Sequence, residues 1–411
     1  MNSERKVPEL LAPAGDTEAL QAAVRFGADA VYLAGTRFGM RAAPANFTMD
    51  ALREAAAFAH ENGVRVYLTC NTLPRSEELA ELERFLPEAA ECGVDAFIAA
   101  DLGTMRLLRR TVPQVPVHIS TQAGVTNYEA ANAFYDMGAK RIIPARELSL
   151  REIAQLRQHI PDDMEIECFV HGAMCVSFSG RCLLSNYLTG RDSNRGACAQ
   201  PCRWKYNLVE ETRPGEYFPI GEDEDGTYIL NARDMCMIRH IPELLDAGVT
   251  SFKIEGRAKS PYYVSVVVNA YRCAINGYLN HPVPNYMPEQ WILDEVYKVS
   301  HREYCTGFYF GDPRENAEIF YDGIYRRFYE TVADVLSYDG TYLHLRQRNK
   351  FRLGDTIEIL EKGKPPVCVT VDHLETEEGE AIDATPHPMM LFRMPLPFAV
   401  HPGALVRKSK E

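Results

Sequence analysis

The 411-residue chain has no long hydrophobic run. A helix that crosses a bilayer needs about 20 apolar residues, and the apolar stretches here reach roughly ten. The first 16 residues, MNSERKVPELLAPAGD, lack the apolar segment of a signal peptide. Low-complexity sequence is also absent. We therefore expect a cytoplasmic protein with reduced thiols and no membrane partner.

The chain also has no excess of basic residues. Lys and Arg number 44 against 57 Asp and Glu, which gives a net charge of −13. Because Lys and Arg bind phosphate groups, this balance does not favour a nucleic-acid partner. A local basic patch can still act against an acidic background, so the charge balance alone excludes little.

The usual hydrolase motifs are missing. The chain contains neither the H-E-x-x-H of zinc peptidases nor the G-x-S-x-G of serine hydrolases. It also lacks a paired signature for a cysteine nucleophile. These absences argue against a hydrolytic centre of the common kinds.

A strand–helix unit repeats through residues 8–172, and most helical stretches end at Gly. Apolar runs predict strands at 9–14, 30–35, 65–71, 96–101, 115–121, 141–146 and 165–171, then a helix at 235–247, an eighth strand at 251–255 and a closing helix at 261–278. Continuous apolar strands that alternate with helices indicate a parallel sheet. Eight such units predict an α/β fold, the (β/α)8 TIM-like barrel. A doubly wound open sheet is the alternative.

The pattern changes beyond residue 301 to alternating polar and apolar residues with Gly-containing turns. This alternation predicts a small all-β, barrel-like domain. The length suggests two or three domains. We place the barrel at 1–285, a cysteine-rich insertion after strand 7 at 172–233, and the β domain at 301–411. The acidic segment 210–226 is predicted to be a surface excursion.

Five of the eleven cysteines fall within residues 167–206. Cys175, Cys182, Cys198 and Cys202 follow the spacing C-x6-C-x15-C-x3-C. Clustered thiolates in a reducing compartment favour soft metals, either zinc or an iron–sulfur cluster. The alternative is free cysteines that pack as small apolar side chains.

Two points about the other cysteines stay open. Cys236 could replace Cys202 as the fourth ligand. The remaining cysteines are predicted to lie in the core, namely Cys70, Cys92, Cys168, Cys273, Cys305 and Cys368.

The cysteine segment matches a family signature at every position. The signature E-x-F-x2-G-[SA]-[LIVM]-C-x4-G-x-C-x-[LIVM]-S is met by Glu167, Phe169, Gly172, Ala173, Met174, Cys175, Gly180, Cys182, Leu184 and Ser185. The segment thus resembles the collagenase-like peptidases, peptidase family U32. The stretches RGACAQPCRWKY, RPGEYFPIGEDEDGTYILNARD and GVTSFKIEGRAKSPYYV are similar to the tRNA-hydroxylating branch of that family. The similarity covers nearly the whole chain.

This resemblance implies an activity and its cofactors. It implies hydroxylation of the wobble uridine of tRNA to 5-hydroxyuridine, dependent on prephenate and on an iron–sulfur cluster (4Fe-4S). It assigns Cys175, Cys182, Cys198 and Cys202 as cluster ligands. Prephenate carries two carboxylates, which Arg and Lys bind well. The expected partners are a tRNA anticodon stem-loop and this small dicarboxylate.

Polar residues gather where the predicted strands end, which is where barrels carry functional side chains. The set is Asn71, Asp101, His118, Gln122, Arg146, Glu147, Glu167, His171, Lys253, Glu255 and Arg257. We predict that the catalytic residues are His171, Glu167, Lys253 and Glu255. We predict that the substrate-binding residues are Arg146, Arg257, His118 and Gln122. The alternative for each charged residue is a structural ion pair, and His171 could equally be a core histidine.

Basic residues alternate near the C-terminal end. Arg346, Arg348, Lys350 and Arg352 would share one face of a strand. Upstream, Arg326 and Arg327 lie among the aromatic residues Tyr321, Tyr325, Phe328 and Tyr329. Basic residues interleaved with aromatic ones suit nucleic-acid binding, so we predict RNA contact here. The alternative is a solvated hairpin face.

Two other functions are alternatives. The first is the peptidase activity in the family's name, with Cys175 or Cys182 as nucleophile and His171 as the nearest base. The second is a non-catalytic iron–sulfur or zinc subunit that binds a partner. Either way the chain could form a homo- or hetero-oligomer.

Overall fold

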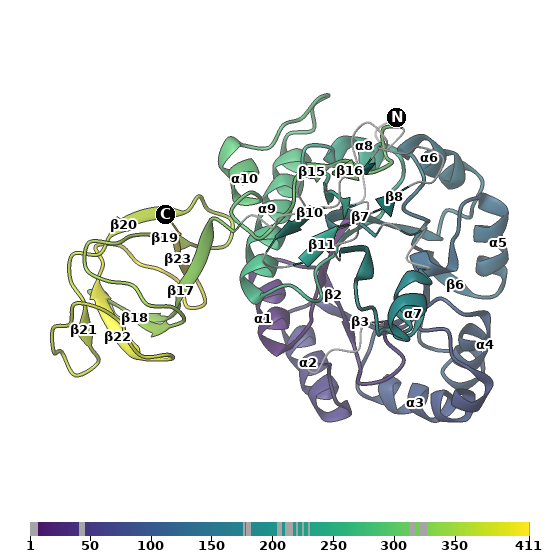
Figure 1. The fold of residues 1–411 in the computed structure, drawn as a ribbon, viewed down its shortest axis with the longest axis horizontal. Helices are drawn as coiled ribbons and strands as arrows, with labels where there is room; N and C mark the ends of the chain where they lie inside the picture. The colour runs from purple at the N-terminus through teal and green to yellow at the C-terminus, as the bar shows by residue number, and fades with distance from the viewer. Residues whose placement is uncertain are drawn as a thin grey trace.

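The computed structural model describes residues 7–40, 46–175, 177, 182–203, 208–209, 217–218, 221–223, 226–228, 231–311, 318–319 and 327–410. Figure 1 shows a barrel ringed by helices, with a smaller β domain beside it. Four residues named above lie outside the described part, namely Gly180, Tyr321, Tyr325 and Arg326. No helix among the described residues is long and apolar enough to cross a membrane.

Eight parallel strands close into a barrel. They are β1 (Glu9–Pro13), β2 (Ala30–Ala34), β3 (Arg65–Cys70), β4 (Ala96–Ala99), β5 (Val117–Ile119), β6 (Ala139–Ile142), β7 (Glu165–Ala173) and β14 (Ser251–Ile254). Neighbouring strands pair in this order, and β14 pairs in parallel with both β7 and β1. The predicted TIM-like barrel is confirmed, and the open doubly wound sheet is wrong.

Helices surround the barrel. They are α1 (Thr17–Phe26), α2 (Met49–Glu61), α3 (Leu79–Glu91), α4 (Leu102–Thr111), α5 (Tyr128–Asp136), α6 (Leu150–Gln158), α8 (Ile241–Asp246), α9 (Pro261–Asn280) and α10 (Gln290–Glu295). Local chemistry sets several of their ends. The Asp16 side chain accepts from the Ala19 N–H before α1, and Ser149 forms a capping box with Glu152 before α6. Helix α1 ends at Gly27, whose φ of 103° favours glycine.

The predicted helix at 235–247 is wrong in its first half. Residues Asp234–Cys236 form β13, which pairs antiparallel with the end of β7, and α8 begins only at Ile241. Strand β15 (Tyr304–Cys305) then pairs with β13. Asp234 is buried and lies 2.8 Å from Arg302, so tertiary pairing overrides the helical periodicity here.

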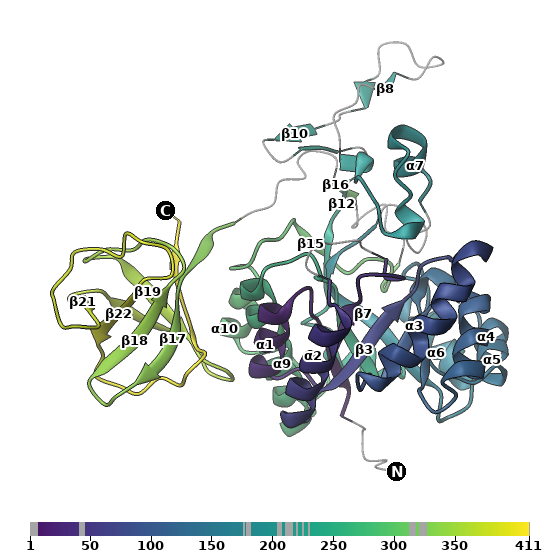
Figure 2. The same cartoon turned by 90° about the horizontal axis from the view of Figure 1, so that it is seen from below.

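The cysteine-rich segment lies over one end of the barrel (Figure 2). It contains α7 (Leu184–Thr189) and the short strands β8 (Leu208–Val209), β9 (Tyr217–Phe218), β10 (Gly221–Asp223), β11 (Gly226–Tyr228) and β12 (Asn231–Ala232), the last paired with β16 (Glu318–Ile319). Because the segment follows β7, it sits at the end toward which the strands point, where barrels carry their active sites. Much of the predicted excursion at 210–226 is outside the described residues.

The C-terminal domain is an antiparallel seven-stranded sheet. Its strands are β17 (Tyr329–Tyr338), β18 (Tyr342–Gln347), β19 (Thr356–Leu360), β20 (Val367–Thr370), β21 (Glu375–Thr376), β22 (Leu391–Pro395) and β23 (Leu405–Ser409). Their order is β20-β19-β23-β17-β18-β22-β21, and its edge strands are not paired with each other within the described residues. The sheet has its own apolar core, which includes Phe351 and Phe392. The predicted all-β domain is confirmed as a half-barrel.

A buried arginine fixes this domain to the barrel. The Arg407 side chain on β23 is fully buried and donates to Glu295 of α10 at 2.6 and 2.7 Å. It also contacts Glu358 of β19 at 2.6 Å, and Lys298 contacts the same carboxylate at 2.9 Å. Burying these charges is costly unless they remain paired, so the interface favours one relative position of the two domains.

A second network of charges lies inside the barrel. The Arg141 side chain is 2% exposed and lies 2.6 Å from Glu9 and 2.9 Å from Glu167. The ammonium of Lys253 lies 2.6 Å from the other Glu167 oxygen, and Tyr67 donates to Glu9 at 2.6 Å. Burial disfavours the charged form of Arg141, but the two carboxylates outweigh it and raise its pKa. The barrel interior therefore depends on this arginine.

We expect Arg141→Met to lower the free energy of unfolding by about 3–5 kcal/mol, because two buried carboxylates lose their shared partner. Urea unfolding at neutral pH measures this. Arg110→Met is the matched control, since Arg110 forms an exposed pair with Glu83 at 2.6 Å and its loss should change little. Equal effects of the two substitutions would contradict the role given to Arg141.

Candidate functional site at the open end of the barrel

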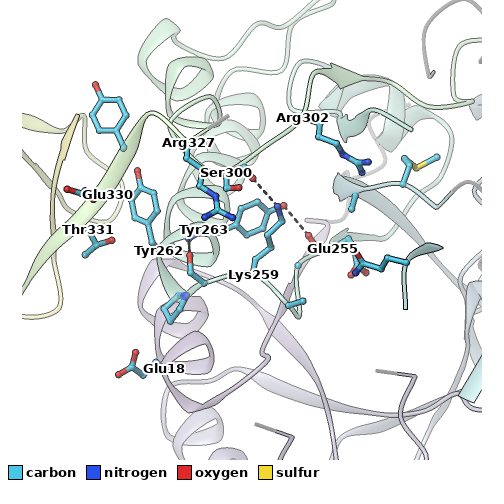
Figure 3. A pocket seen from close by; sticks show the side chains of 18 of the residues that line it. Glu18, Glu255, Lys259, Tyr262, Tyr263, Ser300, Arg302, Arg327, Glu330 and Thr331 are labelled. Atoms are coloured by element: carbon cyan, nitrogen blue, oxygen red, sulfur yellow. Dashed lines mark hydrogen bonds between the residues drawn. The ribbon is translucent and has the colours of Figure 1, made fainter. Parts of the chain in front are cut away.

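A cavity of about 900 Å³ lies at the C-terminal end of the barrel strands. Most of its lining comes from four parts of the chain, and Glu18 of α1 and Ser300 and Arg302 after α10 complete it (Figure 3). The barrel contributes Arg146, Met174 and Glu255, and the cysteine segment contributes Cys175, Arg191, Cys198 and Cys202. The loop before α9 and the first turn of this helix contribute Lys259, Tyr262 and Tyr263. The β domain contributes Arg327, Tyr329, Arg348 and Asn349. The cavity thus joins the barrel mouth to the β domain.

Arg146 places a positive charge at the barrel mouth. It follows β6, and its guanidinium carbon lies 4.4 Å from the centre of the Phe169 ring. Its Nε is buried and has no hydrogen-bond partner among the described residues. Phe169 is itself buried in β7. An aromatic face rather than a carboxylate therefore holds this arginine, which leaves its charge for an anionic ligand.

Two further predicted residues lie near the mouth. Arg257 donates to Thr69 Oγ1 at 3.2 Å and to the Met40 carbonyl at 2.8 Å, so neutral oxygens orient it. It does not line the cavity. Glu255 does line it, and its Oε2 accepts from the Tyr32 hydroxyl at 3.4 Å. Glu255 is the one member of the predicted catalytic set that faces the cavity.

Glu167 and Lys253 lie inside the barrel and not at its mouth. Each is the third residue of its strand, and the two form a buried ion pair at 2.6 Å. The predicted strands, 165–171 and 251–255, already contained both residues, so it was wrong to group them with the side chains at the strand ends. Their contacts favour a structural role over the catalytic one that we predicted.

His171 faces the helix layer. It is 1% exposed, and its ring lies 5.2 Å from Tyr304, 5.5 Å from Tyr271 and 6.0 Å from Tyr263. Its Nε2 is 3.3 Å from the Tyr304 hydroxyl. Burial lowers the pKa of His171 to about 3, so it is neutral at pH 7. These contacts support a structural role for His171 in the core rather than a catalytic role.

The other residues predicted at strand ends do not line the cavity either. His118 is buried edge-on to Tyr67, and burial, together with the charges of Arg141 and Lys253, lowers its pKa well below the usual value. Gln122 is half-buried in the turn after β5. Neither lines the cavity. Asp101 caps the N-terminus of α4 and has a structural role.

Three of the four predicted ligand cysteines line the cavity, namely Cys175, Cys198 and Cys202. Backbone N–H groups point at two of these sulfurs, from Ser177 to Cys175 at 3.5 Å and from Gln200 to Cys198 at 3.4 Å. Such donors suit thiolates that hold a metal or a cluster. In the part of the chain that is described, however, no three His, Cys, Asp or Glu side chains are close enough to share one metal ion. The cysteines therefore fit a thiolate-bound group in the chemistry of their side chains and in lining one cavity, but the described side chains are not gathered around a single metal position.

Cys236 lies elsewhere. Cys236 is on β13, opposite His171 of β7 in the strand pairing, and it does not line the cavity. Burial raises the pKa of its thiol to about 11. This placement favours Cys202 over Cys236 as the fourth ligand. Among the cysteines predicted to lie in the core, Cys368 on β20 is exposed and that prediction was wrong, whereas Cys70, Cys92, Cys168 and Cys305 are buried.

The predicted RNA-binding residues do not share one strand face. Strand β18 ends at Gln347, so only Arg346 of the four lies on it. Arg346 and Arg348 both contact Asp334, at 2.8 and 2.7 Å. Lys350 and Arg352 are exposed in the loop that follows. The alternation that supported the prediction is broken by the end of the strand.

Sequence reasoning missed the cavity wall formed by Lys259, Tyr262 and Tyr263. These residues follow β14, and loops after barrel strands carry function, so the signal was the stretch RAKSPYYV directly after the eighth strand. Lys259 donates to the Ser300 carbonyl at 3.0 Å. Arg191 was missed because no regular spacing marks it.

These features define a class: a TIM-like barrel whose open end is covered by a cysteine segment and flanked by a β half-barrel. The family model described as peptidase family U32 matches residues 15–319, and the model of its C-terminal domain matches residues 327–407. The chain therefore belongs to peptidase family U32, as the motif predicted.

Named relatives cover the chain unevenly. The tRNA hydroxylation protein P1 of Bacillus subtilis is 37% identical over 98% of this chain and 96% of its own length. The tRNA hydroxylation protein P of Escherichia coli is 34% identical over 95% of this chain and 94% of its own. A protein named collagenase from Porphyromonas gingivalis is 35% identical over 74% of this chain and 73% of its own.

The buried His171 generates a pH prediction. The unfolded chain binds a proton at this histidine below about pH 6.5, whereas the folded chain does not until about pH 3. Stability therefore falls as the pH drops through this window, by up to about 1.4 kcal/mol per pH unit for this group. We expect His171→Phe to remove that part of the slope between pH 6 and 4.

Urea unfolding at several pH values measures the slope. His281→Phe is the control, because His281 is exposed at the end of α9 and should leave the slope unchanged. An unaltered slope in His171→Phe would mean that this histidine is accessible to protons in the folded protein.

Proposed function

We propose that this chain hydroxylates the wobble uridine of tRNA to 5-hydroxyuridine, with prephenate as co-substrate. The observation that carries the proposal is the 37% identity to a tRNA hydroxylation protein over nearly the full length of both chains. The cationic cavity at the barrel mouth supports it, because a modifying enzyme of this kind must bind anionic reactants beside a reactive centre.

The dicarboxylate would be bound at the barrel mouth. Arg146 offers a guanidinium with no carboxylate partner among the described residues, held against Phe169. A carboxylate can accept two parallel hydrogen bonds from such a group. Lys259 also lines the cavity, and its ammonium would be the second cation for the second carboxylate. Two cations that line one cavity suit a ligand with two carboxylates.

The target uridine would enter the same cavity from the solvent side. A base has to leave its stack before an enzyme can act on it, and the single-stranded anticodon loop lowers that cost. The Glu255 carboxylate faces the cavity and can accept a hydrogen bond or a proton from the base.

The cysteine segment would hold the cluster. Cys175, Cys198 and Cys202 line the cavity, and Cys182 completes the set in sequence. A cluster bound there would supply one-electron chemistry or a Lewis-acidic iron beside the substrates. The thiolates would also fix the segment over the mouth.

A cysteine peptidase fits this geometry poorly. A thiol nucleophile needs an adjacent base. His171, the histidine nearest in sequence to Cys175, faces three tyrosines on the other side of the barrel wall and is held neutral by burial. The remaining alternative, a non-catalytic subunit, gives no reason for a solvent-connected cavity at the barrel mouth.

Nucleoside analysis tests the activity. In a strain that lacks its own tRNA hydroxylation protein, we expect the wild-type gene to restore 5-hydroxyuridine in tRNA, measured by liquid chromatography with mass spectrometry. Arg146→Met should lower the product by about ten-fold or more, because a charge-assisted contact to the dicarboxylate is lost. Arg110→Met is the control. No product with the wild-type gene would reject the activity, and full product with Arg146→Met would reject the role of Arg146.

The metal assignment predicts a different loss. In anaerobically purified protein, Cys175→Ser should lose bound iron and labile sulfide together, whereas Cys368→Ser on the β domain should keep both. Cys236→Ala separates the two candidate ligands, because it should keep the cluster if Cys202 is the fourth ligand. Full iron content in Cys175→Ser would contradict the ligand set.

A further inference from the structure

The cavity extends well beyond the barrel mouth. It continues past Tyr262 and Tyr263 on the first turn of α9 and reaches Arg327 and Tyr329 of the β domain (Figure 3). A dicarboxylate held near Arg146 would occupy only the barrel end of this space. The outer part, between the barrel and the β domain, is here called the interdomain cleft.

Among the described residues that line the interdomain cleft, Arg327 carries a positive charge outside any ion pair. Its side chain is exposed, reaches toward Tyr263 in Figure 3, and forms no ion pair with any described residue. It lies on the chain just before Tyr329, whose ring lines the same cleft. A lone cation beside aromatic rings is a combination that binds the phosphates and bases of single-stranded nucleic acid.

The outer face of the β domain is different, because its cations are already neutralised. Arg346 contacts Asp334 at 2.8 Å, and Arg393 contacts Glu375 at 2.7 Å. His344 lies between two carboxylates, at 2.9 and 3.2 Å. Binding RNA here would require breaking these pairs. The outer face is therefore a weaker site for phosphate than the interdomain cleft.

The walls of the cleft are held in place. The buried Arg407 pairs with Glu295 of the barrel and Glu358 of the β domain. At the surface, Arg348 contacts Glu18 of α1 at 3.0 Å, and both residues line the cavity. A cleft with fixed walls can bind a flexible strand without paying for domain closure.

We propose that the interdomain cleft holds the single-stranded anticodon-loop RNA next to the target uridine, with a phosphate at Arg327 and bases against the tyrosine wall. This inference rests on the proposed function and adds the path by which the substrate reaches the barrel mouth. Arg327 would make one of the phosphate contacts, so its removal should reduce the salt dependence of binding by about one contact.

The test is the affinity of the protein for an unmodified anticodon stem-loop RNA, measured by fluorescence anisotropy at several salt concentrations. We expect Arg327→Glu to weaken binding by about ten-fold or more and to make the salt dependence shallower by about one phosphate contact. Arg106→Glu makes the same charge change on α4, on the opposite side of the barrel from the β domain in Figure 1, and should bind like the wild type.

Each outcome decides between the alternatives. Unchanged binding by Arg327→Glu would overturn the inference, and a larger loss from Arg352→Glu would move the RNA to the outer face. Binding is measured without turnover, so a wild-type protein that makes no 5-hydroxyuridine would reject the proposed function while a loss in Arg327→Glu still supported the cleft. Conversely, normal product with normal binding by Arg327→Glu would reject only the cleft.

Discussion

The pairing of Arg141 with Glu9 and Glu167 is the contact on which the barrel depends. It joins β1, β6 and β7 at 2.6 and 2.9 Å inside a space closed to water. Charges buried in this way stabilise only the arrangement that keeps them paired, because any other leaves one uncompensated. Lys253 extends the network to β14, the strand that closes the barrel. The charge pairs can therefore form together only when β14 closes the barrel.

The arrangement of the side chains between this charge network and the barrel mouth follows from the pairing of Arg141. Lys253 lies 5.5 Å from the ring of Phe169, and Arg146 lies 4.4 Å from the same ring. Glu167 forms an ion pair with Lys253, whereas Arg146 faces the cavity at the barrel mouth. A rigid, charged floor therefore supports an aromatic layer that presents one unmatched positive charge to a ligand. At the domain interface Arg407 plays the same part, and it fixes the outer wall of the interdomain cleft.

The sequence predicted the fold better than the site. The parallel strands followed from apolar runs and Gly-terminated helices, which are local signals, whereas these signals left a closed barrel and a doubly wound sheet both open. The helix expected at 235–247 was mistaken at β13 because the pairing of β13 with β7 is tertiary. Site predictions depended on which way a strand-end side chain faces. Glu167 and His171 are four residues apart on β7, yet one points into the barrel and the other toward α9, across an irregular register with β14. Periodicity alone cannot give that register shift. The cavity wall from the β domain was equally hidden, since Arg327 approaches the barrel only through tertiary packing.

The central claim is that RNA and the reactive centre meet in one cavity between the barrel, the cysteine segment and the β domain. Photo-crosslinking tests it most directly, with an anticodon stem-loop that carries 4-thiouridine at the wobble position and mass-spectrometric mapping of the modified residues. We expect crosslinks to residues that line the cavity, such as Met174, Tyr262 and Tyr263. Crosslinks confined to the outer face of the β domain, around Tyr342 and Arg393, would contradict it.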